Sequence, residues 1–80
     1  MPKSKLPDVT AQEAIEAFGK VGFKFVRATG GSHHILKKPG HRYHLTIPKH
    51  RHKSIKSGTL RALIRAAGLE VDEFVALLKK

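Results

Sequence analysis

The sequence contains no cysteine and no tryptophan, and it has no long apolar run. Without cysteine no disulfide can staple the chain, which disfavours a small secreted protein. The start carries charge but no apolar stretch behind it, unlike a signal peptide, and nothing approaches the roughly 20 apolar residues that span a bilayer. We therefore expect a soluble, cytoplasmic protein that forms a single domain over residues 1–80 and binds no membrane.

Acidic residues are absent from the long central part of the chain. None occurs between Ala17 and Leu69, and this window holds twelve of the sixteen Lys and Arg residues and all six histidines. The whole chain has a formal net charge of +10. Charge that served only solubility would need no such segregation. The window therefore predicts a polyanionic partner, and nucleic acid is favoured because no long helix with basic and aromatic faces suits a membrane surface.

Helical patterns occupy the two ends of the chain. Residues 10–13, Thr-Ala-Gln-Glu, fit a capping box, and apolar residues at helical spacing follow until Gly22, which can end the helix in a left-handed conformation. Ser57 or Thr59 is expected to cap a second main helix, which Gly68 ends. Residues 71–78 predict a short last helix with its acids in the first turn, where they suit the helix dipole.

Three strands are expected between the helices. They are residues 23–27, with both Phe on one face, residues 33–38, and residues 43–47, with Tyr43, Leu45 and Ile47 on one face and Pro48 ending the strand. Short connections predict an antiparallel sheet that is covered by helices on one side and open on the other. The predicted class is α+β: a double-stranded-RNA-binding-like fold, with a helix, a three-stranded antiparallel sheet, a helix and a short C-terminal helix.

Six histidines are the candidates for chemistry, and they lie within twenty positions: His33, His34, His41, His44, His50 and His52. A single histidine is most often an ordinary polar residue. His50 and His52 could pair on zinc, but without cysteine, a helical His-Glu-x-x-His or an acid in the window, we expect no metal and no cofactor. An imidazole also suits general acid or base catalysis, and RNA carries a 2′-OH that needs only a base to become a nucleophile.

The segment Gly30-Gly31-Ser32-His33-His34 favours one position for this chemistry. Glycines permit close approach of the backbone, so a phosphate could lie against the turn N–H groups and Ser32. His33 and His34 point to opposite sides of a strand, and only one can face RNA on the open side. Periodicity does not choose between them, because the next two residues are both apolar.

Four segments together resemble the HicA (YcfA-like) toxins, a family of small bacterial mRNA interferases. They are the Gly-Phe-Lys-Phe-Val-Arg of residues 22–27, the Gly-Ser-His-His of 31–34, the Thr-Ile-Pro-Lys-His of 46–50 and the helical sequence of 58–69. Each segment alone is weak, but four in order at matching spacing are specific. The resemblance runs from about Leu6 to Phe74.

The resemblance implies a toxin of a type II toxin–antitoxin system that cleaves mRNA without metal. The family's catalytic histidine corresponds to His33, with His34 as the alternative and Ser32 as a possible orienting residue. The implied partner is a HicB-type antitoxin that covers the active site. The loop at 51–53 is more basic and histidine-rich than the family pattern, and whether His50 or His52 takes part stays open. The residues expected to contact RNA are Gly31, Lys37, Lys38, Arg42, Lys49, His50, Arg51 and Lys53.

Two other classes of protein share some of these features. A non-catalytic module that binds structured RNA by shape and phosphate contacts would explain the fold and the charge, but not a histidine directly after a Gly-Gly-Ser turn. A DNA-binding protein would need an element that enters a groove, for which only Arg61 and Arg65, one helical turn apart, offer themselves. Core packing on one side and solvated charge on the other explain that helix equally well.

The acid-free window predicts that RNA binding depends steeply on salt, because each neutralised phosphate releases counterions. We expect the RNA affinity of a cleavage-inactive His33→Ala protein to fall linearly with salt on logarithmic axes. Arg42→Ala or Lys49→Ala should each lower that slope by about 0.7, the value for one neutralised phosphate of a single strand. Titrations at several salt concentrations measure both quantities. An affinity that hardly responds to salt would contradict an electrostatic RNA surface.

Overall fold

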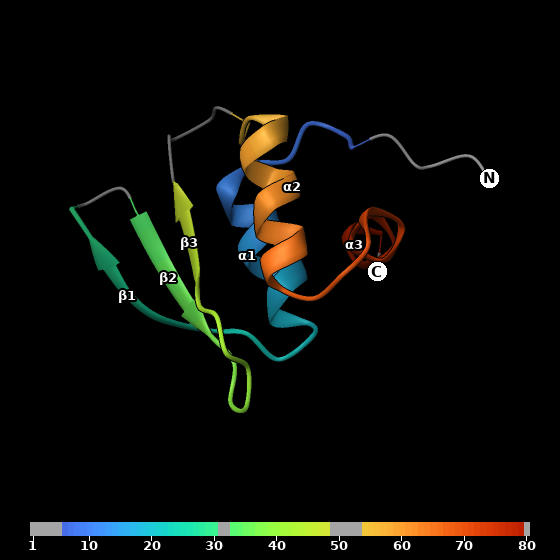
Figure 1. The fold of residues 1–80 in the computed structure, drawn as a ribbon. Helices are drawn as coiled ribbons and strands as arrows, with labels where there is room; N and C mark the ends of the chain where they lie inside the picture. The colour runs from blue at the N-terminus through green and yellow to red at the C-terminus, as the bar shows by residue number, and fades with distance from the viewer. Residues whose placement is uncertain (1–5, 31–32, 49–53, 80) are drawn as a thin grey trace.

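Three antiparallel strands lie between one N-terminal and two C-terminal helices (Figure 1). The computed structural model describes residues 6–30, 33–48 and 54–79. Its elements are α1 (Ala11–Gly19), β1 (Lys24–Thr29), β2 (His33–Lys37), β3 (Leu45–Pro48), α2 (Ser57–Ala66) and α3 (Val71–Leu78). This order confirms the expected α+β class with the double-stranded-RNA-binding-like arrangement. Among the helices described, none is long and apolar enough to cross a membrane.

The sheet has the strand order β1-β2-β3, so β2 is central and antiparallel to both neighbours. Leu36, Leu45 and Ile47 are fully buried on the side where α1 and α2 lie, which we call the covered face. The alternate residues of β2, from His33 to Lys37, point to the other side. We call this side the open face, because no described helix lies on it (Figure 1).

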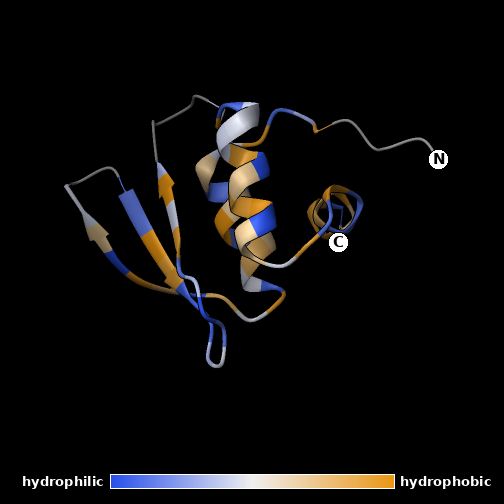
Figure 2. Cartoon of the chain, in the orientation of Figure 1, coloured by the Kyte–Doolittle hydropathy of each residue, from blue (hydrophilic) through white to orange (hydrophobic). Residues whose placement is uncertain are grey.

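The core is organised around Phe18 of α1. Its ring centroid lies 5.0 Å from that of Phe74 in α3 and 6.1 Å from that of Phe23, so one side chain joins both helices to the start of the sheet. Alanines at positions 11, 14 and 17 are also buried and let α1 lie close to its neighbours. The buried residues of α1 and α2 are all apolar, and both helices also carry hydrophilic residues outside the core (Figure 2).

The caps predicted for the helix ends are confirmed only in part. The capping box of α1 is confirmed: the Glu13 backbone N–H donates to Thr10 Oγ1 at 3.2 Å, and the Thr10 N–H donates to Glu13 Oε1 at 2.9 Å. The expected cap of α2 by Ser57 or Thr59 is wrong. Both residues lie inside that helix, whose N-cap is Lys56 with no side-chain hydrogen bond. The last helix begins and ends as predicted, and a Glu70–Glu73 capping box starts it.

The left-handed conformation predicted for Gly22 is confirmed, and Gly68 shares it. Gly22 has φ +104° and Gly68 has φ +80°, a region that residues with a side chain rarely adopt. Gly22 does not itself end α1, however, because that helix ends at Gly19 with Lys20 as its C-cap. The two glycines therefore turn the chain just after α1 and α2, toward β1 and α3 respectively.

The strands depart from their predicted bounds. Phe23 precedes β1 and is buried against Phe18, whereas Phe25 is 54 % exposed, so the two Phe side chains do not share one environment. Phe25 pairs with Leu36 but Arg27 pairs with Ile35, which makes Val26 an extra residue, a β-bulge that breaks the simple alternation.

The other two strands are shorter than expected at one end. The second strand stops at Lys37 rather than residue 38. The third begins at Leu45, because the connection from β2 takes up the residues as far as His44, and Tyr43 is left 58 % exposed outside the sheet. Leu45 and Ile47 are both buried, as predicted for one face, and Pro48 is the last residue of the strand.

Phe18 should be the most costly aromatic residue to truncate. Phe18→Ala removes a buried ring with two ring partners, and we expect it to lower the free energy of unfolding by about 3–5 kcal/mol. Small domains are stable by only about 5–15 kcal/mol, so much of the variant would unfold well below the wild-type Tm. Phe25→Ala is the matched control, with an expected change below about 1 kcal/mol because that ring is half exposed. Urea titrations measure both, and equal decreases would contradict this core.

Candidate nucleic-acid interface

His33 lies at the start of the central strand, exposed on the open face. Its neighbours across the sheet are Thr29 on β1 and Pro48 on β3. Both side chains are small or rigid, and neither they nor any other described residue buries the imidazole. The strand therefore presents one imidazole ring to solvent at the end of the sheet where β1 ends and β2 begins.

His34 has a different environment. It points to the covered face, where its neighbours across the sheet are Ala28 and Ile47, and it is half-buried. Its ring centroid lies 5.4 Å from that of Phe25 at an interplanar angle of 45°, and its Nδ1 is buried with no hydrogen-bond partner among the described residues. The two adjacent histidines, which the sequence left equivalent, thus lie on opposite sides of β2.

The open face carries positive charge at its middle and at the end away from His33. Arg27, which pairs with Ile35, is exposed, and so is Lys37 at the far end of β2. A depression of about 260 Å³ lies between them and is lined by Val26, Arg27, Ile35, Lys37 and His44. Of these five residues, sequence reasoning expected only Lys37 to contact RNA. The bulge at Val26 hid the place of Arg27, and His44 had no signal beyond its residue type.

Two of the predicted RNA contacts lie away from His33. Lys38 is half-buried, and its Nζ lies 5.7 Å from the centroid of the Phe23 ring, a cation–π contact. Arg42 is exposed in the β2–β3 connection, beside a second hollow that Lys37, Lys38 and His41 also line. Lys37, at this end of the sheet, lies four positions along β2 from His33, roughly 13 Å at 3.3 Å per residue. The structure therefore brings neither residue close to His33.

The remaining predicted contacts lie outside the described residues. They are Gly31, Lys49, His50, Arg51 and Lys53, and the possible orienting residue Ser32 and His52 also lie outside them. The possible phosphate site at the Gly-Gly-Ser turn and the possible zinc pair therefore stay predictions. Within residues 6–30, 33–48 and 54–79, no three histidine or acidic side chains lie close enough together to hold a metal ion.

The contacts of His41 give it a structural role. Its Nε2 lies 2.7 Å from the Ala66 carbonyl oxygen, and since a carbonyl can only accept, Nε2–H is the donor. Its ring also contacts the edge of Phe23 at a centroid distance of 5.2 Å. His41 thereby ties the β2–β3 connection to the C-terminal end of α2, where backbone carbonyls lack helical partners. It is part of the framework and does not face the open side with His33.

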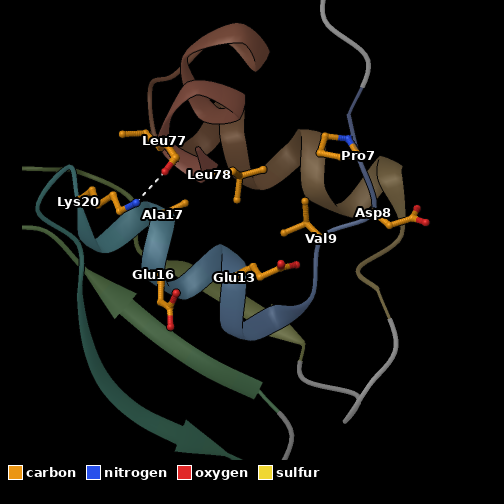
Figure 3. Close-up of a pocket in the computed structure, with 9 residues that line it drawn as sticks. All are labelled: Pro7, Asp8, Val9, Glu13, Glu16, Ala17, Lys20, Leu77 and Leu78. Carbon is orange, nitrogen blue, oxygen red and sulfur yellow. Dashed lines mark hydrogen bonds between the residues drawn. The ribbon is translucent and has the colours of Figure 1, made fainter. Parts of the chain in front are cut away.

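The acids gather on the opposite side of the molecule. A hollow of about 300 Å³ between α1, α3 and the segment before α1 is lined by Asp8, Glu13 and Glu16, and Lys20 donates across it to the Leu77 carbonyl oxygen at 2.8 Å (Figure 3). The other three acids belong to α3 or its N-cap. A phosphate backbone would be repelled there. The molecule therefore has a side suited to polyanions and a side that is not.

The two arginines that the sequence offered for DNA binding lie on the outer side of α2. Arg61 and Arg65 are exposed, while Leu60, Leu63 and Ile64 of the same helix are buried. This is the ordinary division of an amphipathic helix between core and solvent. Packing and solvation account for the sequence of α2, and nothing about the helix requires a groove of DNA.

These features define a small basic α+β protein whose sheet is covered by helices on one face and is open and cationic on the other. The chain belongs to the HicA toxin family, because the family described as HicA toxin of bacterial toxin–antitoxin systems matches residues 11–69, from the first residue of α1 to just beyond α2. Membership implies an antitoxin partner. A comparison with curated proteins finds no match.

Because His41 holds the framework together, its removal should lower stability and leave RNA binding in place. His41→Ala should lower the free energy of unfolding by about 1–2 kcal/mol, because it removes one hydrogen bond and one ring contact. His44→Ala is the control, an exposed histidine expected to change stability by less than about 0.5 kcal/mol. Thermal unfolding compares the two variants. Equal stabilities, or a His41→Ala protein that is fully folded yet no longer binds RNA, would contradict the structural role.

Proposed function

We propose that this toxin is an endoribonuclease that cleaves mRNA without a metal ion, and that His33 is its general base. The observation that supports the proposal is the exposure of His33 on the open face of the sheet, on the same side as Arg27 and away from the acids that line the hollow beside α1. Family membership supplies the toxin context. His34 is the weaker candidate, because it is half-buried against Phe25 on the other face.

The reaction that fits a lone exposed imidazole is attack by the neighbouring 2′-OH of RNA. A ring nitrogen of His33 takes the 2′-OH proton, the 2′-oxygen forms a bond to the adjacent phosphorus, and the bond from phosphorus to the 5′-oxygen breaks. The leaving oxygen takes a proton from the protonated imidazole or from water. The products are a 2′,3′-cyclic phosphate and a free 5′-OH, so DNA, which has no 2′-OH, cannot react.

Positive charge on the open face would assist this reaction. Arg27 lies at the level of Ile35, two residues from His33, and its guanidinium can reach a phosphate beside the imidazole or the next one along. Donors aimed at the charge that develops on phosphorus stabilise the transition state. Lys37 is two residues further away and would hold the RNA rather than the reacting phosphate.

The alternative function is a module that binds RNA without cutting it. Such a protein would use the same face and the same cations, and it would bind equally well with or without His33. The distinction therefore lies in covalent cleavage rather than in affinity.

The partner that fits this face is a HicB-type antitoxin. A nuclease that cuts the messages of its own cell has to be restrained, and a protein that covers the open face would do so directly. The open face is cationic, so the covering surface should be acidic and should associate rapidly. We expect co-expression to restore growth and RNA to compete with the antitoxin. A complex that binds RNA while the antitoxin is present would contradict occlusion.

His33→Ala should abolish RNA cleavage and growth arrest while leaving the fold and RNA binding in place. The side chain is exposed, so its removal should change stability by less than about 0.5 kcal/mol, whereas removal of a general base lowers the rate by about 10²–10⁴-fold. His34→Ala is the matched control and should retain most of the activity once folded. Cleavage that survives His33→Ala and is abolished in His34→Ala would reverse the assignment.

The same assay separates the chemistry from its alternatives. Chelators should leave the rate unchanged, and a 2′-O-methyl group at the cut site should block it. A rate that falls with EDTA and returns with zinc would favour a metal site instead. If the wild-type protein binds RNA but leaves it intact and cells grow normally, the binding-module function is correct.

A further inference from the structure

We propose that the depression on the open face binds a nucleobase of single-stranded RNA, one nucleotide away from the phosphate at His33, and so determines where the RNA is cut. The inference rests on the proposed function and adds a substrate class and a specificity site to it. The depression measures about 260 Å³ and is lined by Val26, Arg27, Ile35, Lys37 and His44.

Its lining combines two apolar side chains with three polar or cationic ones. Val26 is 46 % exposed and Ile35 is half-buried, so both offer methyl groups to a ligand. Arg27 and His44 are planar groups that can stack on a base or donate to its edge, and Lys37 adds a charge for the attached phosphate. Sites that hold small aromatic ligands usually have this composition, an apolar surface with a few placed polar groups.

The bulge in β1 creates this site. Without an extra residue, Val26 and Arg27 would point to opposite faces of the strand. The shift in pairing between Phe25 and Arg27 instead lets both adjacent side chains line one depression. His44 reaches it from the residue directly before β3. Three separate segments of the chain thus converge on one point of the sheet.

The distance from His33 fits one nucleotide. Ile35 lies two residues along β2 from His33 on the same face, roughly 7 Å at 3.3 Å per residue. This is about the length of one nucleotide in an extended single strand. A strand that runs along β2 with a phosphate at His33 therefore places an adjacent base over Val26 and Ile35.

The occupant is a base rather than a carboxylate of a partner protein. A carboxylate would be attracted by Arg27 and Lys37 but would not use the two aliphatic side chains, whereas a base uses both. It is also an unpaired base, because in A-form duplex RNA the bases are stacked and paired, and their edges at the deep groove cannot be reached. The depression therefore predicts a preference for single-stranded RNA.

The first test maps cut sites. Wild-type protein, Val26→Ala and Arg27→Ala are incubated with one long RNA, and the new 5′ ends are sequenced. We expect the preference for favoured over disfavoured sites to fall about tenfold in Val26→Ala, as for methyl groups removed from a binding pocket. Thr46→Ala is the matched control, an exposed open-face residue that pairs with Ile35 outside the depression, and its cut sites should be those of the wild type.

The second test does not need cleavage. The His33→Ala protein is titrated with short single-stranded RNAs in which one abasic site is moved along the sequence. One position should weaken binding by about tenfold, the size expected when one stacked base is removed. Adding Val26→Ala should remove most of this difference, since the two changes then delete the same interaction.

The outcomes separate the two proposals. If the wild-type protein cuts RNA and both depression variants cut at unchanged sites, the base site is wrong while the nuclease stands. If nothing is cut but one abasic position still weakens binding through Val26, the base site stands and the nuclease fails. Equal affinities for all the abasic RNAs overturn the inference, as do variants that are impaired only in binding an antitoxin.

Discussion

The burial of Leu36, Leu45 and Ile47 beneath α1 and α2 sets the register on which the rest of the sheet depends. Side chains alternate along a strand, so a slip of one residue would send this row into solvent and bring His33 and Lys37 into the core. The cost of that exchange fixes one register. The exposure of His33 is therefore a consequence of core packing, and it needs no contact of its own to be maintained.

The register also determines which charged side chains lie on the open face. All six acids lie in α1, in α3 with its N-cap, or in the segment before α1, on the helical side of the sheet. The open face carries Arg27 and Lys37 instead. A protein with a double-stranded-RNA-binding-like fold could in principle present its first helix to RNA. Here α1 exposes Glu13 and carries Glu16, and they would repel phosphates. In this molecule the cationic residues of the sheet therefore lie apart from the acids of the helices.

Much of the fold can be predicted from the sequence, because the signals involved are local. The capping box of α1, the left-handed Gly22 and the short last helix each depend on a few neighbouring residues. The bounds of the strands depend on distant contacts. Phe23 leaves the first strand to pack on Phe18, and the third strand starts late because the β2–β3 connection extends to His44.

The candidate site was predictable only in part for the same reason. The turn before the two histidines marks the place, but their faces depend on which of Ile35 and Leu36 is buried, and both are apolar. In the structure Leu36 is wholly buried and Ile35 is not, so His34 shares the covered face with Leu36 and His33 lies on the open face. Arg27 could not be assigned to the open face from alternation, because a bulge adds one residue without any mark in the sequence. Lys38 could not be known to lie over an aromatic ring.

The bulge at Val26 has a consequence for self-association as well. β1 is an edge of the sheet, and a regular edge presents a row of unpaired N–H and C=O groups on which a second molecule can add a strand. The extra residue interrupts that row, and Lys24 and Arg27 on the same strand would bring like charges together in any such pair. An irregularity in one strand thus works against the aggregation that an exposed valine and phenylalanine at a sheet edge would otherwise invite.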